Sequence, residues 1–513
     1  MSGNFVFAVI SGSLGSGFAH GFHAGLLNIL SGVINDWYDN LDDEDPFENN
    51  DDYNDRGDIV YPNYYDDDHE EPHNPLDITG TKLLLVAVFG LGGILGSLLI
   101  AIFAGLFGRK GSLLCSNGIS LLGLLLMSFA RVAYSFELFI IGRLLLGISA
   151  GLHSGLSPMY LIEIAPECLR GIVGSAYYAS VALAVVAAYI FTLPSVMGSK
   201  GLWPFLFLFA FFPPIIQSVM LVFCPESPKY LYMNKEDEDA AEDSLATLRG
   251  DDIDDEMEEL REEGNILQEI GPVTFARLFN DQTLRSPLII CTVIMFGQQA
   301  CGIDVIIIFS TVLIEGFEYT HSGAINCTIG LGFTLLITCI VSMFLIEKVG
   351  RKMLLMASFG GMFFISICLS ITMILTQSPY VGDQVSHVSV FFIFLYIIMF
   401  ALGVATIPWF LTAELCNHFA RPMSISIATT ANWIIHFIII MSWLPLVVTT
   451  QQNMHKTKTY HLLPGSSRKF CIPNLHRLRF DFGDFCRSYY EGDQRLELHR
   501  HSRIVLRLME HQV

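Results

Sequence analysis

Residues 82–110 read KLLLVAVFGLGGILGSLLIAIFAGLFGRK, an unbroken run of apolar and small residues that ends in a glycine and two cations. A helix needs about 20 apolar residues to cross a bilayer, and this run is long enough. The same Gly-Arg-Lys triplet returns at 350–352, behind a second apolar run. The stretch therefore predicts a membrane protein with two related halves.

The composition of the whole chain agrees with a membrane location. Of 513 residues, 52% are hydrophobic and only 15% are charged, and the mean hydropathy is +0.50. Soluble proteins carry about 25% charged residues. The net charge of −21 arises from two acidic segments, 37–77 and 235–285. No basic stripe remains for nucleic acid, and the eleven scattered cysteines predict no metal site, cofactor or disulfide framework.

Eleven apolar runs are long enough to span a membrane. They lie at 5–34, 82–107, 112–132, 136–160, 172–197, 201–224, 287–314, 323–346, 353–376, 388–412 and 423–449. The pattern predicts an all-α membrane protein with a six-span bundle at 1–224 and a five-span bundle at 287–449. The connection at 225–286 is expected to hold short helices, and the second bundle lacks its last helix.

Basic residues in the short loops predict the orientation. Lys and Arg gather in the loops after the second, fourth, eighth and tenth runs, which the positive-inside rule places in the cytoplasm. The N-terminus is then cytoplasmic, and the acidic segment 37–77 is an extracellular loop that we expect to be largely disordered. The basic tail 450–513 has no run of span length. It is interpreted as an alternative terminus that replaces a final span, and a genuine binding tail is the other interpretation.

Charged residues recur at matching ends of the two halves and predict a cytoplasmic latch. Carboxylates and guanidinium groups from different helix ends can pair when the carrier opens outward, and these pairs must break when it opens inward. The alternative is that the cations only anchor the spans. The residues expected in the latch are Arg109, Glu163, Arg170, Glu347, Arg351, Glu414 and Arg421.

Polar residues inside the apolar runs are the candidates for a substrate site, because they are costly in a membrane. Gln298 and Gln299 are adjacent amides, with the donors and acceptors that a neutral polyol needs. Trp409 follows Pro408, where a broken helix frees backbone groups and an indole can stack on a sugar ring. Asn432 could add another hydroxyl contact. For each of these residues, a packing or interhelical role is the alternative.

Histidines in the first run raise the question of proton coupling. His20 and His23 could relay protons or hydrogen-bond a ligand. A proton-coupled carrier usually needs a buried acid in its first half, and the first run has none before Asp36. The sequence therefore does not favour coupling.

Together these motifs resemble the sugar porters of the major facilitator superfamily, most closely the animal facilitative glucose transporters. The matching stretches include Gly21–Gly25, Pro158–Tyr160, Pro225–Pro228, Gln298-Gln299, Pro408-Trp409 and Arg421-Pro422, within residues 6–449. The resemblance implies two six-helix bundles around a central site, and a facilitative hexose transporter of the plasma membrane that works by alternating access and is not an enzyme. It also implies that Gln298, Gln299, Trp409 and Asn432 contact the sugar.

The chain departs from that family at four positions near the expected site. Asp304, which we include among the substrate-binding candidates, stands where the family has an Asn. Tyr178 replaces a Gln, Leu335 an Asn and Ala401 a Glu. Each lost contact to a hydroxyl costs about 0.5–1.5 kcal/mol. The alternatives are therefore a non-transporting sugar sensor, an inactive truncated isoform, or a carrier of another small polar solute.

Overall fold

The computed structural model describes residues 3–39, 80–250, 253–270, 273–317, 319–376 and 382–462, and these residues form helices and their connections. Residues 40–77 of the predicted acidic loop and 463–513 of the predicted tail lie outside them. The chain divides into two compact units, Met1–Met441 and Ser442–Val513, and the contacts below belong to the first.

The helices follow one another in three groups. The first half holds α1 (Gly3–Asp39), α2 (Gly80–Ala130), α3 (Phe136–Ile164), η1 (Glu167–Leu169), α4 (Arg170–Phe191), α5 (Trp203–Phe209) and α6 (Phe212–Phe223). The linker holds α7 (Pro228–Lys235), α8 (Glu238–Arg249), α9 (Asp254–Ile270) and α10 (Phe275–Asn280). The second half holds α11 (Gln282–Ala300), α12 (Ile303–Glu315), α13 (His321–Val349), α14 (Arg351–Leu375), α15 (Gly382–Leu402), α16 (Ile407–Leu415) and α17 (Arg421–Leu462).

Among the described residues, ten helical stretches are long and apolar enough to cross a membrane. One of them, in α2, contains Gly108 with φ 74° and ψ −167°, a conformation that favours glycine and breaks the helix. It therefore joins two of the predicted runs, and the ten stretches account for all eleven. The prediction of an all-α membrane protein is confirmed. The last helix, α17, continues to Leu462 and so passes the predicted end of its run at 449.

Two spans of the second half are broken in their middle. Gly302, with φ 75°, separates α11 from α12 and has the left-handed conformation that glycine adopts easily. Residues 403–406 separate α15 from α16, and Pro408 lies in the first turn of α16. Broken helices leave backbone groups free inside a membrane, which is tolerated only where protein or ligand satisfies them.

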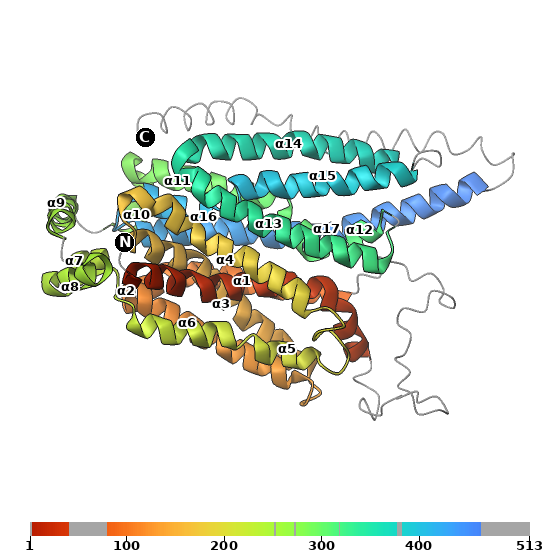
Figure 1. Cartoon of the computed structure of the whole chain (residues 1–513), viewed down its shortest axis with the longest axis horizontal. Coiled ribbons are helices and arrows are strands. Elements are labelled where there is room, and N and C mark those ends of the chain that lie inside the picture. The colour runs from red at the N-terminus through yellow and green to blue at the C-terminus, as the bar shows by residue number, and fades with distance from the viewer. Residues whose placement is uncertain are drawn as a thin grey trace. The chain divides into compact units, whose positions relative to one another are not determined.

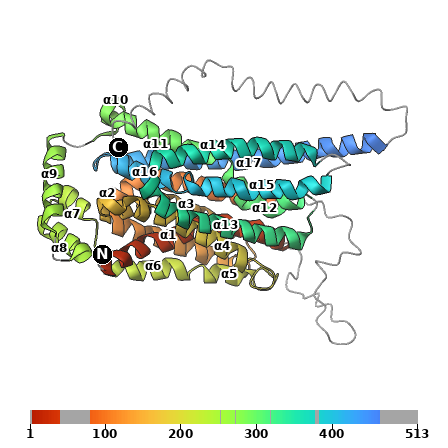
Figure 2. The ribbon, with the colours of Figure 1, turned by 45° about the horizontal axis from the view of Figure 1, so that its top comes forward.

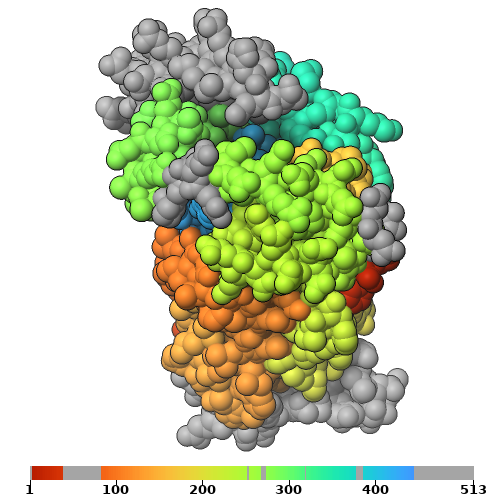
Figure 3. Space-filling model, turned by 90° about the vertical axis from the view of Figure 1, so that its left-hand side faces the viewer, coloured from red at the N-terminus to blue at the C-terminus, as the bar shows by residue number. Residues whose placement is uncertain are grey.

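The long helices run side by side, and α7, α8 and α9 lie at the end where α1 begins (Figures 1 and 2). We call this the basic end, because Arg109 and Arg351 lie there. Figure 3 looks at this end, part of which is covered by the linker helices in yellow-green. The close approach of α1 to α4 depends on Gly21, since a Cβ there would lie 2.2 Å from the Val181 carbonyl oxygen.

Candidate functional site

The amide side chains of Gln298, Gln299 and Asn432 form one buried cluster. Asn432 Nδ2 donates to Gln298 Oε1 at 2.9 Å, and Gln299 Nε2 donates to Asn432 Oδ1 at 3.2 Å. Gln298 Nε2 donates to the carbonyl oxygens of Val404 at 2.7 Å and Ala405 at 3.2 Å. The cluster therefore joins α11 and α17 to the break between α15 and α16, and it brings three of the predicted site residues together.

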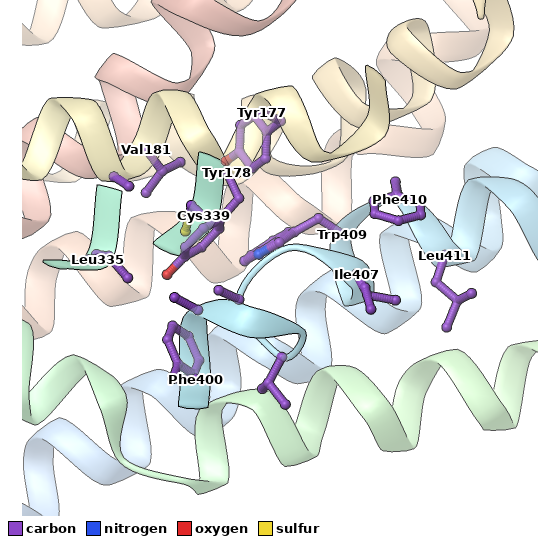
Figure 4. Packing of buried hydrophobic residues seen from close by; sticks show 14 of the residues in the cluster. Tyr177, Tyr178, Val181, Leu335, Cys339, Phe400, Ile407, Trp409, Phe410 and Leu411 are labelled. Atoms are coloured by element: carbon purple, nitrogen blue, oxygen red, sulfur yellow. The ribbon is translucent and has the colours of Figure 1, made fainter. Parts of the chain in front are cut away.

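Trp409 lies beside aromatic residues of the first half. It is 2% exposed, and its indole Nε1 is buried without a hydrogen-bond partner. The rings of His20 and Tyr177 meet it edge-on at 5.8 Å, and Tyr178 stacks on it at 6.4 Å. Figure 4 shows Tyr178 reaching toward Trp409 from α4. A buried N–H without an acceptor costs about 1–3 kcal/mol, so a ligand oxygen placed there would recover that free energy.

The replaced positions make one side of this region apolar. Leu335 and Ala401 are 1% and 0% exposed, and Tyr178 is also buried. Leu335 and Cys339 of α13 and Phe400 of α15 lie around the Tyr178 ring (Figure 4). Leu335 and Ala401 therefore offer no polar side chain to a ligand in this region.

Asp304 lies in the first turn of α12, directly after the break at Gly302. Its Oδ2 is 2.5 Å from Nδ1 of His436 in α17. Asp304, a predicted site residue, thus contacts the imidazole of His436, and no sequence motif predicted this contact. His436 follows Asn432 by four residues, so both lie on one face of α17.

At the basic end, Glu163 of α3 accepts hydrogen bonds from three side chains. Arg109 donates through Nε at 2.8 Å and Nη2 at 3.0 Å, and Ser227 Oγ donates at 2.6 Å. Arg421 Nη1 donates at 3.0 Å from α17. The side chains of Glu163 and Arg421 are 0% and 7% exposed. The buried salt bridge between Glu163 and Arg421 therefore joins the two halves.

A second contact between the halves lies beside this cluster. Arg351 pairs with Glu347 at 3.0 Å and with Glu414 at 2.9 Å. Glu347 Oε1 also accepts the backbone N–H of Gly171, from the first half, at 2.7 Å. Arg170, the remaining predicted latch residue, pairs with Glu167 at 2.9 Å inside its own half.

Two basic-end residues were not predicted from the sequence. Glu226 accepts from the backbone N–H groups of Arg109 and Lys110 at 3.1 Å, and burial raises the pKa of its carboxyl group. His418 Nε2 lies 2.7 Å from Asn234 Oδ1, and burial lowers the His418 pKa well below 6.5, although nearby Glu163 opposes the shift. Glu226 falls within a quoted motif, but nothing in the sequence ties it to a loop more than a hundred residues earlier.

The halves are also joined toward the opposite end. Asn28 of α1 donates to Ser310 Oγ at 2.6 Å and to the Ile307 carbonyl oxygen at 2.8 Å. Tyr189 OH donates to the same Ile307 oxygen at 2.7 Å. The two halves therefore contact each other on both sides of the Trp409 region.

Known proteins share both the sequence pattern and the fold. A family model described as "Sugar (and other) transporter" matches residues 7–461. The solute carrier family 2 facilitated glucose transporter member 1 of Gallus gallus is 35% identical over 379 residues, which cover 73% of this chain and 76% of the relative. Member 3 of Oryctolagus cuniculus is 34% identical over 436 residues, covering 85% and 82%.

Solved structures share the arrangement of helices. The major facilitator superfamily proton:xylose symporter XylE, bound to 6-bromo-6-deoxy-D-glucose, has a TM-score of 0.66 at 18% identity, covering 88% of this chain and 90% of that one. Its partially occluded inward-open form has a TM-score of 0.62 at 19% identity, covering 86% and 92%. At these identities the likeness is one of fold.

Proposed function

Because the chain belongs to the sugar transporter family, with facilitated glucose transporters among its relatives, we propose that it carries hexose sugars across a membrane by alternating access. The predicted family and the predicted major facilitator fold are confirmed. The protein is a multi-pass membrane protein. The sensor and inactive-isoform alternatives are not favoured, since the family match runs from residue 7 to 461.

The observation that supports a sugar site best is the unpaired indole N–H of Trp409 close to polar side chains. A hexose offers oxygen acceptors for such a donor, an apolar C–H face for the ring, and hydroxyl groups for neighbouring amides. The amides already bond to one another, so a sugar would exchange these bonds rather than add to them. We assign substrate binding to Gln298, Gln299, Asp304, Trp409 and Asn432.

Alternating access requires that the two ends open in turn. The contacts of Glu163 with Arg421 and of Gly171 with Glu347 would break when the basic end opens. The contacts of Asn28 would break when the opposite end opens. The proposed latch residues are Arg109, Glu163, Arg170, Glu347, Arg351, Glu414 and Arg421. Arg170 pairs with Glu167 of its own half in this conformation, so it would contribute to the latch only in another conformation.

We place the basic end and the N-terminus in the cytoplasm because of the charge pattern of the short loops. We place the protein in the plasma membrane because it belongs to the family of the glucose transporters. The first bundle then occupies 1–224, the linker 225–286 and the second bundle 287–449, with 450–513 outside the bilayer. Carriage of this kind makes and breaks no covalent bond.

The test is stereoselective sugar exchange by the purified full-length protein in liposomes. We expect D-glucose, but not L-glucose, to exchange. Gln298→Ala should raise the half-saturation concentration about 2–10-fold, the equivalent of one hydrogen bond of 0.5–1.5 kcal/mol. Gln217→Ala is the matched control, because Gln217 is equally buried but bonds to Ser11 and Ser16 within the first half. Absence of selective exchange by the unmodified protein would contradict the proposal.

A further inference from the structure

The two histidines of the first apolar run have different surroundings in the structure. His20 and His23 both lie on α1. His23 is 2% exposed, and its ring packs on Phe22 and Phe89 of its own half. The ring of His20 instead meets residues of the second half. The sugar contacts proposed above all come from the second half, and His20 is a first-half residue that faces this region.

The ring of His20 lies against two tryptophans of the second half. Its centroid is 5.8 Å from the ring of Trp409 in α16 and 5.2 Å from the ring of Trp433 in α17. Trp433 Nε1 donates to Ser154 Oγ at 3.2 Å, so this indole has an acceptor. Trp409 Nε1 has none. The imidazole of His20 therefore lies beside the unpaired donor that supports the sugar site.

The side chain of His20 is less covered than the rings around it. His20 is half-buried. Its neighbours Tyr177, Trp409 and Trp433 are 0%, 2% and 2% exposed. These neighbours belong to α4, α16 and α17, so the ring points between the two halves rather than toward lipid. The side of the ring that they leave uncovered is where a ligand held between the halves can reach it.

One ring nitrogen of His20 is used by the protein and the other is not. Nδ1 lies 2.9 Å from Tyr177 OH, whereas Nε2 makes no hydrogen bond within the described part of the chain. In a neutral imidazole one nitrogen donates and the other accepts. If Nδ1 accepts from the tyrosine hydroxyl, Nε2 donates, and if Nδ1 donates, Nε2 accepts. A sugar hydroxyl can do either, so it matches Nε2 in both tautomers.

The bond to Tyr177 also orients the imidazole. Tyr177 is fully buried in α4, and its ring meets Trp409 edge-on at 5.8 Å. His20, Tyr177 and Trp409 therefore contact one another from three different helices. A group that is held in place before a ligand arrives loses less conformational entropy when the ligand binds. Nε2 is thus the free nitrogen of a fixed ring.

A contact from the first half has a consequence for transport. A ligand shifts a conformational equilibrium only if it makes different contacts in the two conformations. A sugar bound by the second half alone would make the same contacts whether or not the first half is near. A sugar that accepts from Trp409 Nε1 and also bonds to His20 Nε2 connects the halves and favours the conformation in which both reach it.

We propose that His20 binds the sugar from the first half and determines specificity, with its Nε2 hydrogen-bonded to one hydroxyl group of the hexose. Trp409 and the amide cluster hold the same sugar from the second half. The inference rests on the proposed sugar transport and adds a first-half contact to that site. The alternative role for His20 is structural, in which it only packs between the aromatic rings and supports Tyr177.

A double-mutant cycle between sugar and protein separates the two roles. Purified full-length protein in liposomes exchanges labelled D-glucose, and the concentration of unlabelled sugar that halves this exchange is measured. The sugars are D-glucose and the deoxy-D-glucoses that each lack one hydroxyl group. His20→Phe keeps an aromatic ring without its nitrogens, and it should weaken D-glucose binding about 2–10-fold. One deoxy sugar should bind equally well to both proteins, because the hydroxyl that His20 contacts is already missing.

Two matched variants and one direct measurement complete the experiment. Tyr177→Phe removes the bond to Nδ1 but leaves Nε2 in place, so the same hydroxyl should keep its contribution to binding. His23→Phe makes the identical change among first-half rings, and the half-inhibitory concentrations should stay unchanged. A structure of the unmodified protein with D-glucose bound should place His20 Nε2 within hydrogen-bond distance of a sugar oxygen, and it decides the inference even if His20→Phe does not fold.

Each outcome supports or overturns the inference. If His20→Phe weakens every sugar by the same factor, or weakens none, His20 does not contact a hydroxyl and the inference is overturned. If Tyr177→Phe loses the discrimination as fully as His20→Phe, the effect belongs to the bond between these residues, which also overturns it. In these cases selective exchange by the unmodified protein leaves the proposed sugar transport in place. Absence of selective exchange by the unmodified protein would remove both proposals.

Discussion

The contact between Arg421 and Glu163 provides the sharpest test of the latch. Arg421→Ala removes the 3.0 Å bond that joins α17 to α3, while Arg109 keeps both of its bonds to Glu163. The carboxylate thus stays paired, and the loss falls mainly on the contact between the halves. A hydrogen bond to a charged group contributes about 1.5–3 kcal/mol, so the population with an open basic end should rise about 10–150-fold.

Hydrogen–deuterium exchange can measure this opening at a defined amide. The N–H of Gly171 is held by Glu347 across the halves at 2.7 Å, so a peptide that contains Gly171 reports on closure of the basic end. Arg421→Ala should speed its exchange by at least tenfold in lipid nanodiscs. Arg170→Ala is the matched control, since Arg170 pairs within its own half with Glu167, which is 77% exposed. Such exposed pairs contribute at most about 1 kcal/mol.

Two results would refute the reasoning. The first is unchanged Gly171 exchange in Arg421→Ala, which would mean that the buried pair does not hold the halves together. The second is equal acceleration in Arg421→Ala and Arg170→Ala, which would mean that any loss of positive charge at the basic end has the same effect. A melting temperature for each variant separates local opening from general unfolding.

Three further predictions concern single positions. Trp409→Phe should weaken sugar binding about 2–10-fold yet raise the melting temperature of the empty protein, because it removes an unpaired buried N–H; equal melting temperatures would contradict this. Gly302→Ala should cost about 1–2 kcal/mol through its positive φ, although nothing lies within 4 Å of the added Cβ, whereas Gly360→Ala in α14, also in open space, should not destabilise. Burial in the closed form lowers the pKa of His418, so below pH 6.5 the imidazole binds a proton more readily when the basic end is open. The free energy that favours the closed basic end should therefore fall as the pH drops from 7.5 to 5.5. Gly171 exchange compared with His418→Gln at each pH checks this, and identical curves would refute it.

Much of the fold could be predicted because span length and repetition are local properties. An apolar run either is or is not long enough to cross a bilayer, whatever surrounds it. The Gly-Arg-Lys triplets at 108–110 and 350–352 likewise predicted two related halves, because a repeat can be recognised without knowing any contact. The site was predicted in part for a related reason: a polar residue inside an apolar run stands out, as Gln298 and Asp304 do.

The contacts of these residues could not be predicted in the same way. Lipid and protein interior are equally apolar, so a membrane helix carries little sequence signal of which face meets which neighbour. Asp304 and His436 are separated by 132 positions, and only the packing of α12 against α17 brings them together. Arg170 resembled Arg421 in the sequence as a cation at a span end, but in the structure its side chain pairs with Glu167 of its own half.

The sequence by itself determined the class of the protein, its repeated spans and the polar residues available to a substrate, since all three depend on which residues occur along short stretches. Only the tertiary structure decided which charges neutralise one another. It placed Glu163 between Arg109 and Arg421, gave Asp304 an imidazole, and left the Trp409 indole without an acceptor. The physical reason is that charge pairing and hydrogen bonding act over a few ångströms, and such distances are set by packing between helices rather than by the order of residues within them.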